Sequence, residues 1–139
     1  MGRVVHVMVA VVQNPAGEVL LALRPKNAHQ GGLWEFPGGK LKPDETPTQG
    51  LVRELQEELA IEPLASEPLT QISHDYGDKA VFLDVYRVRA YSGEPCGNEG
   101  QQVRWVAPRD LRAYDFPAAN RGIVDWLSES DCHLRPGRP

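Results

Sequence analysis

The sequence predicts a single α+β domain with a mixed β-sheet between helices. Several segments rich in β-branched residues alternate with turn residues, as strands do, and two segments have the apolar spacing of amphipathic helices. Strands and helices mixed in this way favour layers around one core. A chain of 139 residues buries roughly two thirds of its unfolded surface, so it needs no disulfide. We expect residues 1–130 to form the domain and residues 131–139 to form a polar tail or the start of a linker.

The first third of the chain predicts strands joined by turns. Val4–Val12 is rich in valine and is expected to be a mostly buried strand. Asn14–Gly17 has the composition of a turn and Glu18–Leu23 that of a second strand, so we expect a hairpin. Pro25–Gly32 is a polar loop, and the backbone then has to turn tightly at Pro37–Gly39.

The first helix is predicted to begin near Thr46. Thr46 can serve as the N-cap, Pro47 suits the first helical position, and Gln49 completes a capping box. Pro63 is expected to stop the helix. Its buried stripe recurs every four residues, at Leu51, Leu55 and Leu59.

The rest of the chain predicts three strands and a second helix. Leu69–His74 and Lys79–Tyr91 have the composition of strands, the latter with alternating apolar residues. Gly93–Gly100 is expected to be a loop and Val103–Val106 a short strand. Pro117–Leu127 is expected to be the second helix.

Charge and composition exclude several classes of function. The net charge is −4 and no block of lysine or arginine occurs, which argues against a polymeric nucleic acid as the main partner. No apolar run approaches the roughly 18 residues of a membrane span, and residues 1–6 lack the core of a signal peptide. Cys96 and Cys132 form no metal or redox motif. We therefore expect a cytoplasmic monomer that binds a small molecule and no membrane.

Three carboxylates share one flank of the first predicted helix. With Leu51 at zero, Glu54, Glu57 and Glu58 fall at about 300°, 240° and 340°, beside the leucine stripe. Such a cluster in an arbitrary helix is most often a solvated acidic face, and its like charges oppose helix formation. These glutamates, however, adjoin apolar positions and follow a glycine turn. Carboxylate and carbonyl oxygens together suit a hard divalent cation such as Mg²⁺.

The segment from Gly39 to Ile61 resembles the Nudix box, G-x5-E-x7-R-E-U-x-E-E-x-G-U, in which U is an aliphatic residue. Every fixed position matches except one, because Ala60 stands where the family has glycine. The resemblance implies the Nudix fold, an α/β/α sandwich, and hydrolysis of a nucleoside diphosphate linked to another group. Alanine enters the left-handed region at a cost of about 1–2 kcal/mol, so we expect the helix end to shift by a residue or so.

Three segments outside the box resemble the MutT-type 8-oxo-dGTP diphosphatases. Residues 33–40, L-W-E-F-P-G-G-K, are similar to the K-L-E-F-P-G-G-K lead-in of these enzymes. Residues 93–101 are similar to their G-E-P…G-K-E-G-Q segment, and residues 115–120, D-F-P-A-A-N, to their D-F-P-P-A-N segment. The resemblance covers most of residues 4–127.

The resemblance implies a catalytic metal centre that holds Mg²⁺, with Mn²⁺ as a substitute. Its implied ligands are the Gly38 carbonyl, Glu54, Glu57, Glu58 and Glu99. The base that activates water is either Glu54 or Glu99, and both remain open. We expect Glu45 and Arg53 to form a structural pair that joins the loop to the helix.

The resemblance also implies the substrate contacts. Arg24 and His29 are expected to contact phosphate or sugar, and the backbone from Glu35 through Phe36 and Pro37 to Gly38 to complete the site. Asn120 is the candidate for base recognition, because one amide accepts from N7–H and donates to O6 of 8-oxoguanine. Without the resemblance, Asn120 would be assigned a bond to the backbone near a helix start.

The activity implied is magnesium-dependent hydrolysis of 8-oxo-dGTP to 8-oxo-dGMP and pyrophosphate, by attack of water on the β-phosphorus. This reaction would cleanse the nucleotide pool and prevent mutation during DNA replication, a form of DNA repair. A related pyrophosphohydrolase acting on CTP, methylated dCTP or another nucleoside triphosphate is the alternative, against which Asn120 argues. A non-catalytic Nudix-fold binding module is disfavoured because all the box glutamates are present.

Overall fold

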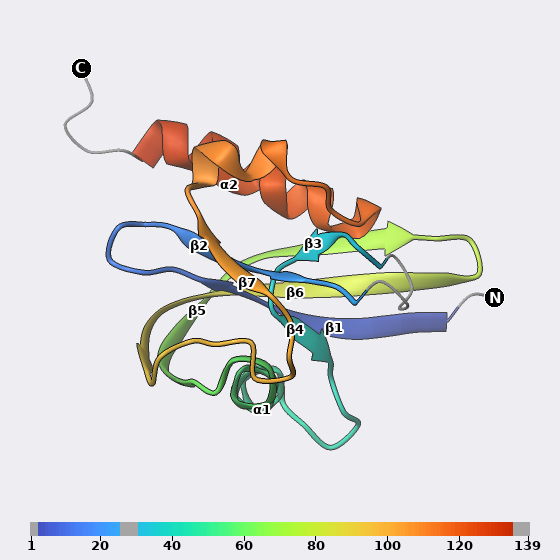
Figure 1. The fold of residues 1–139 in the computed structure, drawn as a ribbon. Coiled ribbons are helices and arrows are strands. Elements are labelled where there is room, and N and C mark those ends of the chain that lie inside the picture. Colours follow the sequence, from blue (N-terminus) through green and yellow to red (C-terminus); the bar gives the residue numbers. More distant parts are fainter. Residues whose placement is uncertain (1–2, 26–30, 135–139) are drawn as a thin grey trace.

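Two helices lie on opposite sides of the strands in the computed structural model, which describes residues 3–25 and 31–134. Helix α1 (Pro47–Leu59) covers one side and helix α2 (Arg121–Leu134) the other (Figure 1). The predicted α/β/α arrangement is confirmed. Within the described ranges, no helix is both long and apolar enough to cross a membrane.

The strands form two sheets, not one. The first is mixed, because β1 and β6 run parallel while its other pairs are antiparallel. Its strand order is β4 (Gly38–Lys40), β1 (Arg3–Val12), β6 (Lys79–Ser92) and β5 (Glu62–Asp75). The second sheet is antiparallel, in the order β3 (Trp34–Glu35), β2 (Val19–Leu23) and β7 (Val103–Val106).

The predicted hairpin between the first two strands is wrong. β1 pairs with β6 along one edge and with β4 at Val7–Val9 along the other, and the Ala10 N–H donates to the Pro37 carbonyl at 2.8 Å. Both edges of β1 are therefore used at its centre. β2 joins the second sheet instead, and an isolated bridge pairs its first residue, Val19, with Gln13, the residue after β1.

β1 is one of the two inner strands of the mixed sheet, and both of its faces are buried from Met8 to Val12. Met8, Ala10 and Val12 pack with the leucine stripe of α1, whereas Val9 and Val11 face the cluster that includes α2. A strand buried on both faces explains the nearly continuous run of valine in this segment.

Helix α1 begins as predicted and ends earlier. Thr46 caps it, and both bonds of the capping box with Gln49 are present. Pro63 does not stop the helix, because Ala60 already ends it in the left-handed conformation, at φ 59° and ψ 35°. The Ala60 N–H donates to the Gln56 carbonyl at 3.1 Å, as in the αL motif. The shift that we expected from alanine at this position does not occur.

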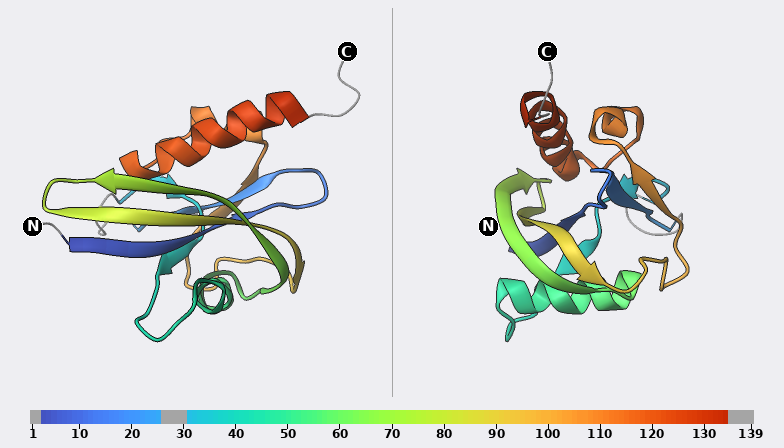
Figure 2. Two further views of the ribbon diagram at one scale, coloured as in Figure 1. Left: turned by 180° about the vertical axis from the view of Figure 1, so that it is seen from behind. Right: turned by 90° about the vertical axis from the view of Figure 1, so that its left-hand side faces the viewer.

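The second helix is displaced from its predicted position. Pro117 precedes a short 3-10 turn, η2 (Ala118–Asn120), and α2 starts at Arg121. It continues to Leu134, so residues 131–134, expected in the tail, are helical. Another 3-10 segment, η1 (Pro108–Ala113), follows β7. Figure 2 shows β5 and β6 as a long twisted hairpin whose turn lies near the start of β1.

Candidate active site

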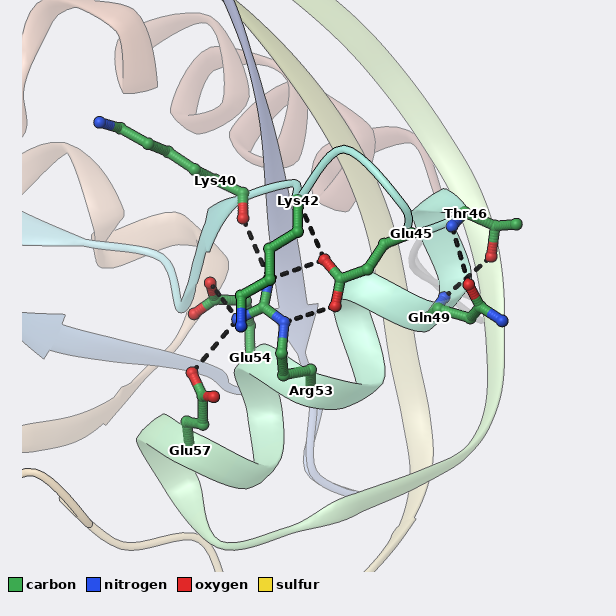
Figure 3. A network of polar contacts seen from close by, with 8 residues as sticks. All are labelled: Lys40, Lys42, Glu45, Thr46, Gln49, Arg53, Glu54 and Glu57. Atoms are coloured by element: carbon green, nitrogen blue, oxygen red, sulfur yellow. Dashed lines mark hydrogen bonds and ion pairs between the residues drawn. The ribbon is translucent and has the colours of Figure 1, made fainter.

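Arg53 links the loop before α1 to the helix itself (Figure 3). Its guanidinium donates two hydrogen bonds to Glu45, one to Glu54 at 3.0 Å and one to Glu57 at 3.2 Å. A further bond reaches the Lys40 carbonyl at 3.1 Å. Hydrogen bonding to Arg53 lowers the pKa of Glu45 to about 2. The predicted pair of Glu45 and Arg53 is therefore present, and it ties the helix to the end of the glycine turn.

The glycine turn fits closely around two of the glutamates. The Gly38 N–H donates to Glu58 Oε1 at 3.2 Å. Gly38 has φ 147°, and a Cβ there would collide with the Met8 carbonyl. At Gly39 a Cβ would overlap the carboxylate of Glu54. At Gly38, only glycine allows the backbone to lie so close to β1.

Negative charge at the site exceeds what the nearby cations balance. Burial raises the pKa of Glu58 to about 8, against a hydrogen bond from Gly38, and the charges of Glu54, Glu35 and Glu99 raise it further. Burial also raises the pKa of Glu54, although Arg53 opposes this. Carboxylates that repel one another in this way would be stabilised by a bound cation.

The loop before β7 brings Glu99 to the helix. Asn98 donates from its backbone N–H to the Glu58 carbonyl at 2.9 Å and from Nδ2 to the Glu57 carbonyl at 3.0 Å. Gln101 donates from Nε2 to the Glu58 carbonyl at 2.9 Å and accepts from the Glu99 N–H at 3.0 Å. The last carbonyls of a helix lack partners within it, so this loop both caps α1 and positions Glu99. These caps are not predictable from the sequence, because nothing local relates the loop to a helix some forty residues earlier.

The donors of this cluster suit a hard divalent metal ion. In residues 3–25 and 31–134, no three His, Cys, Asp or Glu side chains are already arranged to hold one. The oxygens nevertheless come from carboxylates beside a turn of backbone carbonyls, which Mg²⁺ and similar cations prefer. Glu58 and Glu54 both lie against the glycine turn, and burial raises the pKa of Glu58, so a cation held there would stabilise the ionised carboxylates.

A cavity of about 150 Å³ brings together three predicted substrate contacts, Arg24, Glu35 and Asn120. Arg24 Nη1 donates to Glu35 Oε1 at 2.6 Å. Burial raises the pKa of Glu35 despite this bond. Tyr76 and Lys79, from the turn between β5 and β6, also line the cavity. Neither residue was predicted to belong to the site, although both lie at the junction of two predicted strands. Apolar side chains complete the wall: Val7, Val81, Leu83, Pro117 and Ala119.

The remaining predicted contacts are Phe36, Pro37 and His29. Phe36 is buried and stacks on Phe116, with ring centroids 5.4 Å apart, and Pro37 is buried beside it. The side chain of Phe36 thus belongs to the core and leaves only its backbone for a ligand. His29 lies outside the described residues.

Comparison with known proteins identifies the family. The NUDIX domain family matches residues 8–126. The 8-oxo-dGTP diphosphatase of Escherichia coli K12 is 36% identical over 122 residues, 88% of this chain and 95% of that protein. The CTP pyrophosphohydrolase of the same organism is 36% identical over 137 residues, 99% of this chain and 98% of that protein. A structure from a study of MutT from Aliivibrio salmonicida and Vibrio cholerae has a TM-score of 0.82 at 34% identity, covering 92% of this chain and 99% of that one.

These matches span the glycine turn, the glutamates of α1 and the cavity at Asn120. The resemblance to the Nudix box is therefore confirmed, and the chain belongs to the NUDIX domain family.

Proposed function

We propose that this chain hydrolyses 8-oxo-dGTP to 8-oxo-dGMP and pyrophosphate in the presence of Mg²⁺. The observation that carries the proposal is the cavity containing Asn120 beside the glutamate cluster. Glu35 lines that cavity, and Gly38, three residues later, donates its N–H to Glu58, so residues 35–38 connect the cavity to the cluster. A base held at Asn120 would direct its phosphates towards the glutamates. The 8-oxo-dGTP diphosphatase named above supports this choice of substrate.

The metal would be held by the Gly38 carbonyl and by four carboxylates, Glu54, Glu57, Glu58 and Glu99. When bound, a divalent metal ion supplies charge neutralisation at the phosphates and lowers the pKa of water. Mn²⁺ is proposed to substitute for Mg²⁺, because both favour oxygen ligands.

Water would attack the β-phosphorus, and the bond from this phosphorus to the α–β bridging oxygen would break. The bridging oxygen would leave with 8-oxo-dGMP, and the oxygen of water would remain in pyrophosphate. Two carboxylates are candidates to accept the proton from water. Glu54 lies against the glycine turn and is held by Arg53, whereas Glu99 is on the loop that caps α1.

Arg24 and Asn120 are proposed to contact opposite parts of the substrate. Arg24 would bind phosphate or sugar, together with His29, and Asn120 would recognise the base edge. Asn120 pairs its amide oxygen with N7–H and its amide nitrogen with O6 of the oxidised base. Ordinary guanine has an acceptor at N7, so two acceptors, N7 and the amide oxygen of Asn120, would face each other without a hydrogen bond.

The proposed role is removal of an oxidised precursor before DNA replication uses it. We propose that the chain acts as a cytoplasmic monomer on a free nucleotide. A net charge of −4 is in keeping with a nucleotide and not a nucleic-acid polymer as the partner.

Hydrolysis of CTP or a related nucleotide is the second candidate. The CTP pyrophosphohydrolase from Escherichia coli aligns over 99% of this chain, at the same identity as the diphosphatase.

Values of kcat/KM for 8-oxo-dGTP, dGTP, CTP and dCTP at equal Mg²⁺ test the proposal. We expect 8-oxo-dGTP to exceed dGTP at least tenfold, with release of pyrophosphate. A highest value for CTP would establish the second candidate, and no pyrophosphate from any nucleotide would indicate a binding module. The variant Glu58→Gln, purified in the same way, controls for contaminating hydrolases.

A further inference from the structure

The turn that carries Asn120 has little support of its own. η2 has three residues, Ala118–Asn120, and no side chain caps it. The Asn120 N–H donates to the Pro117 carbonyl at 2.9 Å. The N–H of Ala119, by contrast, lies too early in the turn to find a carbonyl within it. Because Ala119 is 5% exposed, its N–H needs an acceptor from elsewhere in the protein.

The hydroxyl of Tyr76 supplies that acceptor. The Ala119 N–H donates to Tyr76 Oη at 3.1 Å. Tyr76 follows β5, and its own backbone N–H donates to the Lys79 carbonyl at 2.8 Å. Its ring packs edge-on against His74, with centroids 4.5 Å apart. Backbone and ring thus hold the hydroxyl in place from the tip of the β5–β6 hairpin.

Other contacts already hold the residues on either side of η2, so the Tyr76 hydroxyl acts on η2 alone. Phe116 stacks on Phe36 just before the turn, and just after it Gly122 lies so close to Ile72 that an added Cβ would be 3.0 Å from the Ile72 side chain. These contacts fix the two ends of the segment. Between them, the bond from Tyr76 reaches the residue immediately before Asn120, inside the same cavity.

We propose that Tyr76 is a positioning residue, whose hydroxyl orients the amide of Asn120 by holding η2. This inference rests on the proposed function, in which Asn120 recognises the base. Hydrogen bonds weaken steeply with misalignment, and a displacement of about 1 Å can cost up to about 100-fold in rate. The β5–β6 hairpin would therefore contribute to specificity without forming a bond to the base edge.

The test is a double-mutant cycle with Tyr76→Phe and Asn120→Ala. Tyr76→Phe keeps the ring and removes the acceptor. We expect it to lower kcat/KM for 8-oxo-dGTP about tenfold, mainly by raising KM, and to lower kcat/KM for dGTP less. In the Asn120→Ala background the same change should cost less than about twofold, because coupled residues are not additive.

Tyr114→Phe is the matched control. The hydroxyl of Tyr114 accepts a hydrogen bond from Arg104 Nη1 at 3.3 Å and lies outside the Asn120 cavity. This variant should leave the ratio between the two substrates unchanged. An equal tenfold loss from Tyr76→Phe with and without Asn120 would overturn the inference, as would no loss in a folded Tyr76→Phe protein.

A measurement independent of turnover separates this inference from the proposed function. In ¹H–¹⁵N spectra, Tyr76→Phe should shift the Ala119 amide and the Asn120 side-chain NH₂ signals, whereas Tyr114→Phe should not. Unmoved Asn120 signals would refute positioning whatever the substrate. A wild-type enzyme that does not favour 8-oxo-dGTP would instead refute the proposed function, and the cycle would then use its best nucleotide.

Discussion

Arg53 on α1 and Glu45 in the preceding loop form a bidentate ion pair, with 2.5 Å from Nε to Oε2 and 2.9 Å from Nη2 to Oε1. Two parallel charge-assisted bonds fix direction as well as distance. The same guanidinium binds the Lys40 carbonyl, so the pair connects the helix to the end of β4 and its glycine turn. Geometry at the glutamates thus depends on a pair that contains no proposed metal ligand.

The first prediction concerns the pH dependence of this pair. The pKa of Glu45 falls from its ordinary 4.5 to about 2 in the folded state. A lowered pKa stabilises the fold above pH 4.5, and this contribution disappears as the pH falls towards 2. Glu45→Gln should therefore be less stable than wild type at pH 6, with the difference closing near pH 2. Thermal unfolding of both proteins from pH 2 to 7 measures this.

Asp44→Asn serves as its control, because Asp44 is an exposed neighbouring carboxylate. It should follow the wild-type profile. A constant difference between Glu45→Gln and wild type at every pH would mean that ionisation of Glu45 does not contribute to stability.

The second prediction concerns Glu58. Mutation of a residue that only supports a metal ligand typically lowers metal affinity or activity about 10- to 100-fold. Glu58→Gln removes a proposed ligand itself, so it should reduce kcat/KM by more than that. In EDTA the same variant should be more stable than wild type. The pKa of Glu58 is 4.5 in the unfolded chain and is raised to about 8 in the metal-free fold. Ionisation of Glu58 therefore lowers the free energy of unfolding as the pH rises from 4.5 to about 8.

Denaturant unfolding in EDTA at pH 5 and pH 8.5 measures that difference, which should be small at the lower pH and larger at the higher one. The exposed Glu62, changed to Gln, controls for the loss of one negative charge. Full activity of Glu58→Gln, or of wild type in EDTA, would remove Glu58 from the metal site.

The third prediction concerns Ala60, whose φ of 59° is the one positive value at a non-glycine residue in the described chain. Glycine removes the left-handed penalty of about 1–2 kcal/mol, which stabilises the fold. Its greater freedom in the unfolded chain opposes this by about 0.4–1 kcal/mol. Ala60→Gly should therefore raise the free energy of unfolding by about 0.5–1 kcal/mol. Urea denaturation checks this, and Ala113→Gly, at an exposed position of ordinary backbone conformation, should destabilise.

Local patterns predicted α1 and its glutamates because their causes lie within a few residues. Thr46 and Gln49 form their capping box across three residues, and the leucine stripe follows from the helical repeat. The end of the helix is different. Ala60 takes the left-handed conformation that alanine disfavours. Asn98, far along the chain, caps a carbonyl of the last turn of α1, and local propensity does not predict that contact.

Pairing of the strands was less predictable for the same reason. Residues 4–12 and 18–23 are adjacent in sequence and separated by a good turn, which favours a hairpin. Partners from far away, β4 and β6, occupy the edges of β1 instead. The contact of Tyr76 with Ala119 joins residues 43 positions apart, so only the folded chain reveals it.

The fourth prediction concerns the bond that is broken. Hydrolysis in H₂¹⁸O should place the label in pyrophosphate, because water is proposed to attack the β-phosphorus. Mass spectrometry of both products measures the label. Label in the nucleoside monophosphate would indicate attack at the α-phosphorus and would refute this mechanism, although the family assignment would stand.

The last prediction concerns Asn120 and the choice of base. Asn120→Ala removes two neutral hydrogen bonds to a buried base edge, a loss of about 1–3 kcal/mol for 8-oxo-dGTP. At about 1.36 kcal/mol per tenfold, this is roughly a ten- to hundredfold fall in kcat/KM. For dGTP the fall should be smaller, because the contact with its N7 was never favourable. The preference between the two substrates should therefore largely disappear.

Two features of the site make this outcome specific to recognition. Asn120 lines the cavity, whereas the proposed metal ligands lie on α1, the glycine turn and the loop before β7, so the dependence on Mg²⁺ should not change. The fold at η2 keeps the Tyr76 bond to the Ala119 backbone, which Asn120→Ala does not remove. If Asn120→Ala lowered kcat/KM by the same factor for 8-oxo-dGTP and dGTP, Asn120 would only support the fold. The substrate would then have to be sought among other nucleotides, beginning with CTP.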